Sequence, residues 1–214
     1  MSHYPIDKSK NPVPIRLFNS DFLEFFTHIT PIAILIIWVP IIAIFLARAI
    51  LSAQGSSFPV NILAGFLIGI FLWTFLEYTI HRFVFHFEPH GKIAERIVFL
   101  FHGIHHAQPQ VKTRLVMPPA ASIPMAFIFY GLYVLVISDL LKISLWLAPI
   151  FAGTLFGYVI YDLIHYATHH LPMRSGYLKF LKQHHMKHHY KTPDKRYGVS
   201  SPLWDYVFRT MPND

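Results

Sequence analysis

Residues 183–190 read Gln-His-His-Met-Lys-His-His-Tyr, with four histidines in six positions. If this stretch is helical, residues three and four apart share a face, so His185, His188 and His189 point their imidazoles into one volume. His184 together with His188 and His189 forms an alternative set. Three converging neutral imidazoles are typical of a transition-metal site, whereas a solvated, histidine-rich surface tract needs no such spacing. The rest of the chain decides between these interpretations.

The composition of the chain indicates an integral membrane protein. Of the 214 residues, 54% are hydrophobic and only 14% are charged, below the usual charged share of about 25%, and the mean hydropathy is +0.42. The net charge of +7 is explained by lysine and arginine beside membrane spans, so we predict no nucleic-acid partner. The chain contains no cysteine, which excludes disulfides, zinc–thiolate sites and iron–sulfur clusters.

Four apolar stretches are each long enough to cross a bilayer as a helix, which takes about 20 residues. We predict an all-α membrane protein whose four transmembrane helices form two hairpins, the first closed by a short uncharged turn at 52–57. Residues 1–29 form a polar arm ending in an interfacial amphipathic helix at 18–28, and residues 30–214 form a single membrane domain. The predicted spans are at about 31–51, 60–79, 122–141 and 143–164.

Lysine and arginine are distributed unevenly over the connecting segments. The loop at 52–58 carries none and the region 139–145 carries only Lys142, whereas the arm, the 81–119 loop and the 166–214 tail carry nearly all the rest. By the positive-inside rule, both termini and the middle loop are cytoplasmic. The 81–119 loop and the tail then form a helical cap on the cytosolic side.

Four clusters of histidines lie on that same side of the membrane. The second and fourth spans run directly into histidines as they leave the bilayer, and the middle loop and the tail supply two more clusters. Ten imidazoles are too many for one ion but suit two ions of about five ligands each, and an all-nitrogen set favours Fe, Zn or Cu over Mg or Ca. The predicted metal ligands are His81, His86, His102, His105, His106, His165, His169, His185, His188 and His189.

Three of the four clusters have α-helical spacing, with histidines three or four residues apart. His81 and His86 are instead five apart, about 140° around an α-helix, so we predict that they reach different ions. His170 and His184 are additional candidate ligands. His3, His28 and His90 have no matching partner in the sequence, and we interpret them as non-ligands.

Two carboxylates near the span ends are candidates for the outer hydrogen bond that a metal-bound imidazole needs. Glu77 lies four residues before His81, and Asp162 lies three residues before His165. A carboxylate at the edge of a bilayer is costly unless it has a partner. The alternative is that both are ordinary interfacial carboxylates.

Each histidine cluster forms a short motif. The motifs read His81-Arg-Phe-Val-Phe-His86, His102-Gly-Ile-His105-His106, His165-Tyr-Ala-Thr-His169 and His185-Met-Lys-His188-His189-Tyr190-Lys191. Two flanking segments are equally distinctive: Arg114-Leu-Val-Met-Pro-Pro119 and Tyr197-Gly-Val-Ser-Ser-Pro-Leu-Trp-Asp-Tyr-Val-Phe208. On these residues the chain resembles the fatty acid hydroxylase superfamily, the histidine-box membrane di-iron oxygenases, over about residues 60–210. It is most similar to the fatty acid and sphingolipid acyl-chain 2-hydroxylases.

The resemblance implies an oxidoreductase that hydroxylates a lipid acyl chain, with carbon 2 favoured, using two metal ions and O2 as co-substrate. Iron is the expected metal, and zinc can replace it in a purified sample. The resemblance also favours His185 over His184 in the last motif. Electrons are expected from a separate cytochrome- or ferredoxin-type protein, since 214 residues leave no room for a fused haem domain. Residues 171–214 form a lid, in which Trp204, Tyr206 and Phe208 either line the site or pack the lid core.

One position departs from the 2-hydroxylase pattern. Those enzymes usually carry an aspartate two residues after the proline that follows the second motif, whereas here Pro109 is followed by Gln110 and Val111. The lipid substrate therefore stays open, and a desaturase or a sterol, carotenoid or head-group hydroxylase is the alternative. A non-catalytic metal-binding protein or a metal transporter is less favoured, because the spans hold few polar ligands for a conduction path. A metalloprotease is unfavoured because the chain contains no His-Glu-x-x-His motif.

Overall fold

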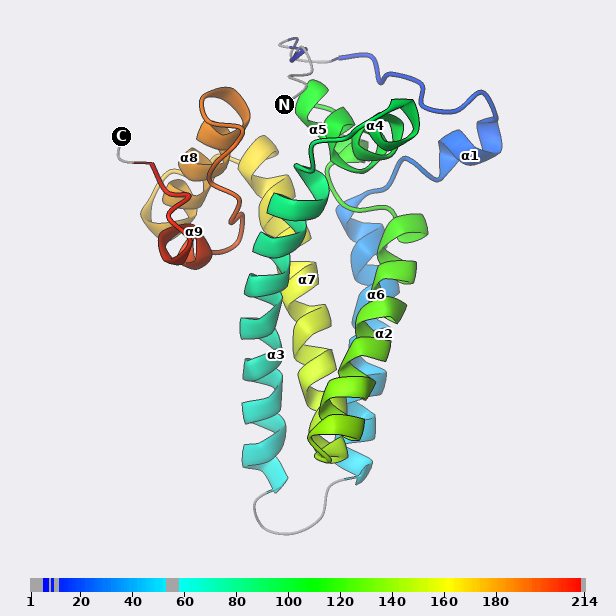
Figure 1. Cartoon of the computed structure of the whole chain (residues 1–214), viewed down its shortest axis with the longest axis vertical. Helices are drawn as coiled ribbons and strands as arrows, with labels where there is room; N and C mark the ends of the chain where they lie inside the picture. Colours follow the sequence, from blue (N-terminus) through cyan, green and yellow to red (C-terminus); the bar gives the residue numbers. More distant parts are fainter. Residues whose placement is uncertain (1–5, 8, 10–11, 53–57, 213–214) are drawn as a thin grey trace.

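The computed structural model describes residues 6–7, 9, 12–52 and 58–212, and within these ranges all regular structure is helical. Four long helices run side by side, and the shorter helices gather at one end (Figure 1). The long helices are α2 (Pro31–Ser52), α3 (Phe58–Ile80), α6 (Pro119–Tyr133) and α7 (Leu147–His170). Four stretches are long and apolar enough to cross a membrane: Pro31–Ser52, Pro59–Phe85, Lys112–Leu140 and Ser144–His170. The predicted four-span helical membrane fold is confirmed.

Two of the spans continue beyond their α-helical parts as π-helices. The π-helix η1 (His81–Phe85) extends α3, and η4 (Val134–Leu140) extends α6. Pro119 begins α6, where its missing N–H costs nothing and its fixed φ suits a first helical turn. The predicted turn at 52–57 lies outside the described residues, apart from Ser52. The shorter elements are α1 (Asp21–Phe25), α4 (Lys92–Val98), η2 (Phe99–Gly103), α5 (Ile104–Ala107), η3 (Lys112–Arg114), η5 (Ser144–Trp146), α8 (Gly176–Tyr190) and α9 (Leu203–Val207).

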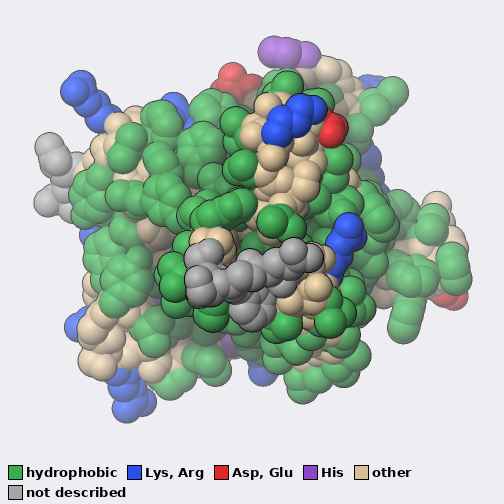
Figure 2. Space-filling model, turned by 90° about the horizontal axis from the view of Figure 1, so that it is seen from below, with side chains coloured by type: hydrophobic (Ala, Val, Ile, Leu, Met, Phe, Trp, Pro, Cys, Tyr) green, Lys and Arg blue, Asp and Glu red, His purple; other side chains and the backbone are tan. Residues whose placement is uncertain are grey.

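Helix α7 is the centre of the bundle. In the most apolar 18-residue stretch of its span 78% is buried, against 17 to 22% in the corresponding stretches of the other three spans. Glycines bring α3 against it: a Cβ atom on Gly69 would lie 2.0 Å from the carbonyl oxygen of Ile150, and one on Gly153 would lie 2.0 Å from that of Phe66. Small residues at such contacts are typical of helices that pack in membranes. The other helices leave apolar side chains outward, and these cover most of the surface at the end opposite the histidines (Figure 2).

Replacing Gly153 with alanine is expected to reduce the free energy of unfolding by about 3 kcal/mol, because the new methyl group would force the α3 and α7 backbones apart. The matched control is Gly131→Ala in α6, where a Cβ atom meets nothing within 4 Å. That change should stabilise the protein by about 0.5 kcal/mol, since alanine restricts the unfolded chain. Thermal unfolding of both variants in detergent measures the difference, and equal melting temperatures would contradict the close contact.

The N-terminal arm lies over the middle loop rather than apart from it. Ile15 donates its backbone N–H to the side-chain oxygen of Gln108 at 2.9 Å, and the Gln108 amide donates to the Val13 carbonyl at 2.9 Å. The predicted amphipathic helix at 18–28 is present as the shorter α1. Phe22 and Phe25 on this helix are 71% and 72% exposed, as a helix lying in a membrane interface requires.

The aromatic residues near the C-terminus pack against α3. The Trp204 indole N–H donates to Thr74 at 3.0 Å, and its ring centroid lies 4.9 Å from that of Phe75. Phe208 stacks on Tyr78 with a centroid separation of 5.3 Å. Trp204 and Phe208 thus pack against a span and not in the lid core, and Tyr206 is 58% exposed.

Candidate metal centre

The structure brings the ten predicted ligands together as two groups of five. Within each group, one nitrogen from every imidazole lies within 4.8 Å of all the others. Five imidazoles per group is the number expected when ten imidazoles are shared between two ions. The first group is His81, His86, His102, His106 and His188, and the second is His105, His165, His169, His185 and His189.

Histidines from one motif do not all belong to one group. His102 and His106 lie in the first group, but His105 lies in the second. In α8, His188 lies in the first group and His189 in the second. The expectation that the last motif points three imidazoles into one volume is therefore wrong. Adjacent positions differ by about 100° around an α-helix, so neighbours face different centres, whereas histidines four apart stay together.

His81 and His86 share the first group, although their α-helical separation predicts different ions. The reason is that η1 is a π-helix, in which the His86 N–H donates to the His81 carbonyl at 3.1 Å. This i→i+5 turn is wider than an α-helical turn and returns His86 to the side of His81. Helix η2, which carries His102, is also a π-helix. Single π turns of this kind are frequent at functional sites.

The nitrogen spacing in the second group fits a shared metal ion. The Nε2 atoms of His165, His105, His189, His185 and His169 follow one another at 2.9, 2.8, 3.0 and 2.9 Å. A ring nitrogen carries either one proton or one lone pair, so the Nε2 atom of His105 cannot bond to both neighbours. Two nitrogens at right angles on a metal, each about 2.1 Å from it, lie about 3 Å apart. The donor set therefore suits a metal better than it suits hydrogen bonds among imidazoles.

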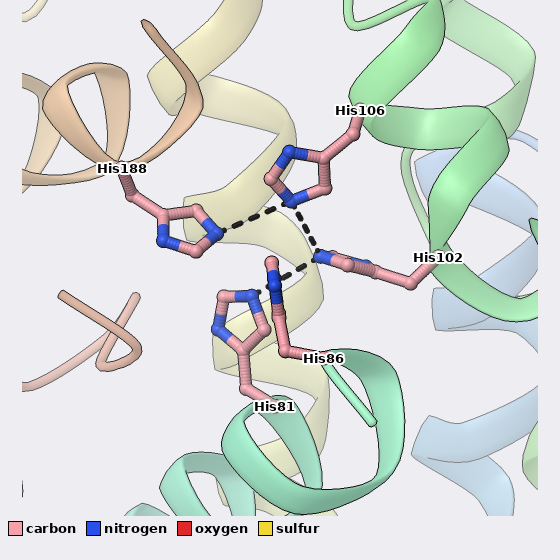
Figure 3. A group of neighbouring side chains, drawn as sticks. All are labelled: His81, His86, His102, His106 and His188. Carbon is pink, nitrogen blue, oxygen red and sulfur yellow. Dashed lines mark hydrogen bonds between the residues drawn. The ribbon is translucent and has the colours of Figure 1, made fainter. Parts of the chain in front are cut away.

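The first group has the same character. Its five imidazoles point toward one volume from η1, from η2 and α5, and from α8 (Figure 3). The Nε2 atom of His102 lies 3.1 Å from that of His81 and 3.0 Å from that of His106, which in turn lies 3.2 Å from that of His188. Nitrogen ligands alone suit iron, zinc or copper.

The two additional candidates, His170 and His184, belong to neither group. His184 instead places its Nε2 atom 3.1 Å from a carboxylate oxygen of Asp205, and its Nδ1 atom lies 3.4 Å from the Arg196 guanidinium. The alternative set containing His184 therefore does not form, whereas His185 lies in the second group. Among the predicted non-ligands, His28 and His90 are in neither group and His3 lies outside the described residues.

Glu77 and Asp162 do not bond to the histidines that helical spacing pairs them with. Glu77 accepts the backbone N–H groups of Val199 and Ser200 at 2.5 and 2.8 Å. The Asp162 oxygens lie 3.3 and 3.4 Å from the backbone nitrogen of Met117. The expected direct contacts are thus replaced by contacts to backbone N–H groups, which a buried carboxylate can also use as partners.

Backbone carbonyls take the place expected for the carboxylates. His81 places its Nδ1 atom 2.5 Å from the carbonyl oxygen of Tyr197, and His188 places its own 2.6 Å from that of Lys195. Such bonds fix the tautomer and leave Nε2 free for a metal. The sequence holds no signal for them, since every residue carries a carbonyl group.

Burial keeps the imidazoles of His102, His105, His188 and His189 neutral, and an imidazole must be neutral to bind a metal ion. Burial lowers the pKa of His188 to about 4, although the Lys195 carbonyl opposes the shift. Burial and neighbouring imidazoles also hold the pKa values of His102, His105 and His189 well below the ordinary value.

The free energy of unfolding of the metal-free protein should fall as the pH decreases. Between about pH 6.5 and the lowered folded-state pKa values, the unfolded chain binds protons that the folded chain does not. These histidines therefore leave the free energy of unfolding unchanged above about pH 6.5 and lower it progressively below that pH. Thermal unfolding of the metal-free protein from about pH 7 to about pH 5 measures this loss. A melting temperature independent of pH would contradict the neutral, buried state of these imidazoles.

Two cavities reach the histidines. The first, of about 300 Å³, is mainly apolar and is walled by the arm, α1, η2, the 114–121 segment and α7, with His102, His105 and His165 in its lining. The second, of about 320 Å³, reaches His86 and His106 and has a mixed lining, in which Glu88 and Glu95 stand beside apolar residues such as Phe87 and Val98. The histidines thus have two approaches, and the second one carries acidic residues.

The comparisons with known proteins identify the family. Residues 66–210 match the sequence model of the family described as fatty acid hydroxylase. The chain belongs to the fatty acid hydroxylase family. It is 37% identical over 210 residues to the dihydroceramide fatty acyl 2-hydroxylase FAH1 of Arabidopsis thaliana, covering 98% of this chain and 84% of that protein. It is 36% identical to the fatty acid 2-hydroxylase of Mus musculus, covering 98% of this chain and 58% of that protein.

A solved structure shows the same fold. The chain superimposes on the full-length scs7p structure, in which only the hydroxylase domain is visible, with a TM-score of 0.81 and 36% identity. The match covers 90% of this chain and 70% of that one. The resemblance inferred from the histidine motifs is confirmed, and the protein is a membrane-embedded oxidoreductase of the hydroxylase type.

Proposed function

We propose that this protein hydroxylates the acyl chain of a membrane lipid at carbon 2, with O2 as co-substrate. The observation that carries the proposal is the pair of five-histidine groups beside an apolar cavity whose lining includes His102, His105 and His165. The names of the related 2-hydroxylases support both the substrate class and the position. The presence of Val111 where these enzymes usually carry an aspartate leaves the exact lipid substrate open.

The ten grouped histidines are the proposed ligands of two iron ions. When bound, the ions supply the activation of O2 and the oxidation of a C–H bond. The side chains do the rest: His81 and His188 are held through their Nδ1 atoms by the 195–197 backbone, so their Nε2 atoms stay directed at one point. Burial of both groups keeps bulk water from the reacting carbon.

The apolar cavity is the proposed site of the acyl chain. Its walls include Phe101, Val116 and Met117, and Ala120 and Ala121 from the first turn of α6. A chain rising beside α6 from the membrane reaches the histidines along walls that are mainly apolar, with Arg114 and Asp162 also in the lining. Each buried methylene contributes about 0.8 kcal/mol to such binding.

We place the histidine end of the molecule on the cytoplasmic side, together with both termini. Support comes from the distribution of lysine and arginine, which favours the arm, the middle loop and the C-terminal tail. We also regard residues 30–214 as one domain and 1–29 as its arm, because the apolar cavity needs walls from both.

The proposed electron donor is a separate acidic protein of the cytochrome or ferredoxin type. Residues 163–193 contain five lysines and arginines and no aspartate or glutamate, so α8 carries a positive face behind its three grouped histidines. Opposite charge accelerates and orients such encounters. We expect turnover with a reduced acidic ferredoxin to fall as ionic strength rises, while turnover with a small uncharged reductant stays constant. Equal salt dependence would contradict docking by charge.

The direct test uses the purified, iron-loaded protein with a reductant, O2 and lipids deuterated at carbon 2 of the acyl chain. Mass spectrometry should show the gain of one oxygen and the loss of one deuterium. Retention of both deuterium atoms would place the hydroxyl group elsewhere, and a loss of two hydrogens without oxygen would indicate a desaturase. The absence of any oxygen-dependent product would contradict the proposal as a whole.

A further inference from the structure

The segment 195–200, between α8 and α9, contacts the first histidine group. It supplies two carbonyl oxygens, those of Lys195 and Tyr197, to the Nδ1 atoms of His188 and His81. The segment has no regular helical structure, so its shape depends on what binds its N–H groups.

Asp205 on α9 holds the first half of this segment. Its two carboxylate oxygens accept the backbone N–H groups of Tyr197 at 2.9 Å and Gly198 at 2.8 Å. They also accept the Thr210 hydroxyl at 2.7 Å and lie 3.1 Å from the Nε2 atom of His184. The carboxylate is fully buried, and a buried charge with four partners fixes its surroundings firmly.

Glu77 on α3 holds the second half. It accepts the N–H groups of Val199 and Ser200 and also bonds to the Ser200 hydroxyl. Glu77 is one α-helical turn before His81, whose Nδ1 atom meets the same segment. The span that includes His81 thus also carries a carboxylate that holds the segment two residues beyond the Tyr197 carbonyl.

The second group has less of this support: over the described part of the chain, only His165 has a backbone hydrogen bond, to Leu115. The Nδ1 atoms of His105, His169, His185 and His189 are buried without a hydrogen-bond partner among the described residues. The two groups therefore have similar ligand sets but differ in what orients the ligands.

We propose that Asp205 and Glu77 are positioning residues for the first group, and that this group binds its metal more tightly than the second. The proposal rests on the two-metal function given above. An acceptor on the outer nitrogen fixes the ring and makes its other nitrogen more basic, and loss of such a partner costs 10- to 100-fold in metal affinity. We expect a difference of about that size between the two groups.

The binding order is measured with zinc as the probe metal, since it requires no turnover. The wild-type protein, loaded with zinc and equilibrated against increasing chelator, should lose its two ions in two separate steps. His188→Ala and His189→Ala, neighbours on α8, assign the steps: the first variant should lack the tight ion and the second the weak one. Two ions that leave in one step would overturn the inequality while leaving the proposed function intact. Failure to bind any metal would overturn both.

Asp205→Asn tests the positioning role. The amide keeps one oxygen and turns an N–H donor toward a backbone N–H group, so zinc affinity of the first group should fall 10- to 100-fold and that of the second should not change. Glu77→Gln should act in the same direction and serves if the first variant does not fold. Tyr78→Phe is the control, since it removes a buried hydroxyl that bonds to Thr210 but touches no N–H group of 195–200. The positioning role would be overturned if the zinc affinity of the first group were unchanged in both Asp205→Asn and Glu77→Gln. It would also be overturned if Tyr78→Phe lowered that affinity equally.

Discussion

The variant His169→Ala is expected to retain one tightly bound metal ion per chain and to lose hydroxylation by more than about 100-fold. Loss of the outer hydrogen-bond partner of a metal ligand lowers metal affinity or activity 10- to 100-fold. Loss of the ligand itself should lower them at least as much. The Nε2 atom of His169 lies 2.9 Å from that of His185, so the variant opens one corner of the second group. Metal content by mass spectrometry and product formation on the same sample measure the two effects.

The adjacent variant His170→Ala is the matched control. His170 has the same residue type on the same helix, but it lies outside both groups, with its ring 4.9 Å from that of Tyr166. It should keep both metals and change activity by no more than about twofold, as substitutions away from a site do. If His170→Ala lost a metal ion and His169→Ala kept both, the metal ligand at this end of α7 would be His170 and not His169.

The variant Ala121→Trp should keep both metals and still lose activity. Ala121 lines the apolar cavity at the start of α6, and an indole there takes the space of about four methylene groups. At about 0.8 kcal/mol for each displaced methylene, kcat/KM should fall by roughly 200-fold. Steady-state kinetics and metal content together separate this loss from that of His169→Ala.

Ala47→Trp on the exposed side of α2 is the control for added bulk. It faces away from the cavity lining, so kcat/KM should stay within about twofold of the wild type. An Ala121→Trp protein with full activity would mean that the acyl chain reaches the histidines by another route, for which the second cavity, at His86 and His106, is the alternative.

The span count and the choice of His185 over His184 follow from the sequence because they depend on local pattern. Apolar length alone predicts a span, and the family motifs distinguish between the two registers on α8. The central place of α7 does not follow in this way. It depends on Gly69 and Gly153, which allow α3 to approach, and a glycine in a span carries no signal of which helix it meets.

The grouping of the histidines could be predicted only in part. The number per group follows from counting, but the assignment of His81 and His86 to one ion depends on a π turn that the α-helical period excludes. The predicted hydrogen bonds between Glu77 and His81 and between Asp162 and His165 do not form, for a related reason. Helical spacing compares residues on one element, whereas both carboxylates bind backbone N–H groups of other segments.

Two pairs of sequence neighbours connect the candidate metal positions. His105 and His106 belong to different groups, and so do His188 and His189. Adjacent Cα atoms are about 3.8 Å apart whatever the fold does, so each pair acts as a covalent spacer between the two groups. The histidines of α7, His165 and His169, belong to the second group alone, so the two pairs of neighbours and not this helix fix the distance between the groups. We expect a single-residue insertion between either pair of neighbours to change that distance directly.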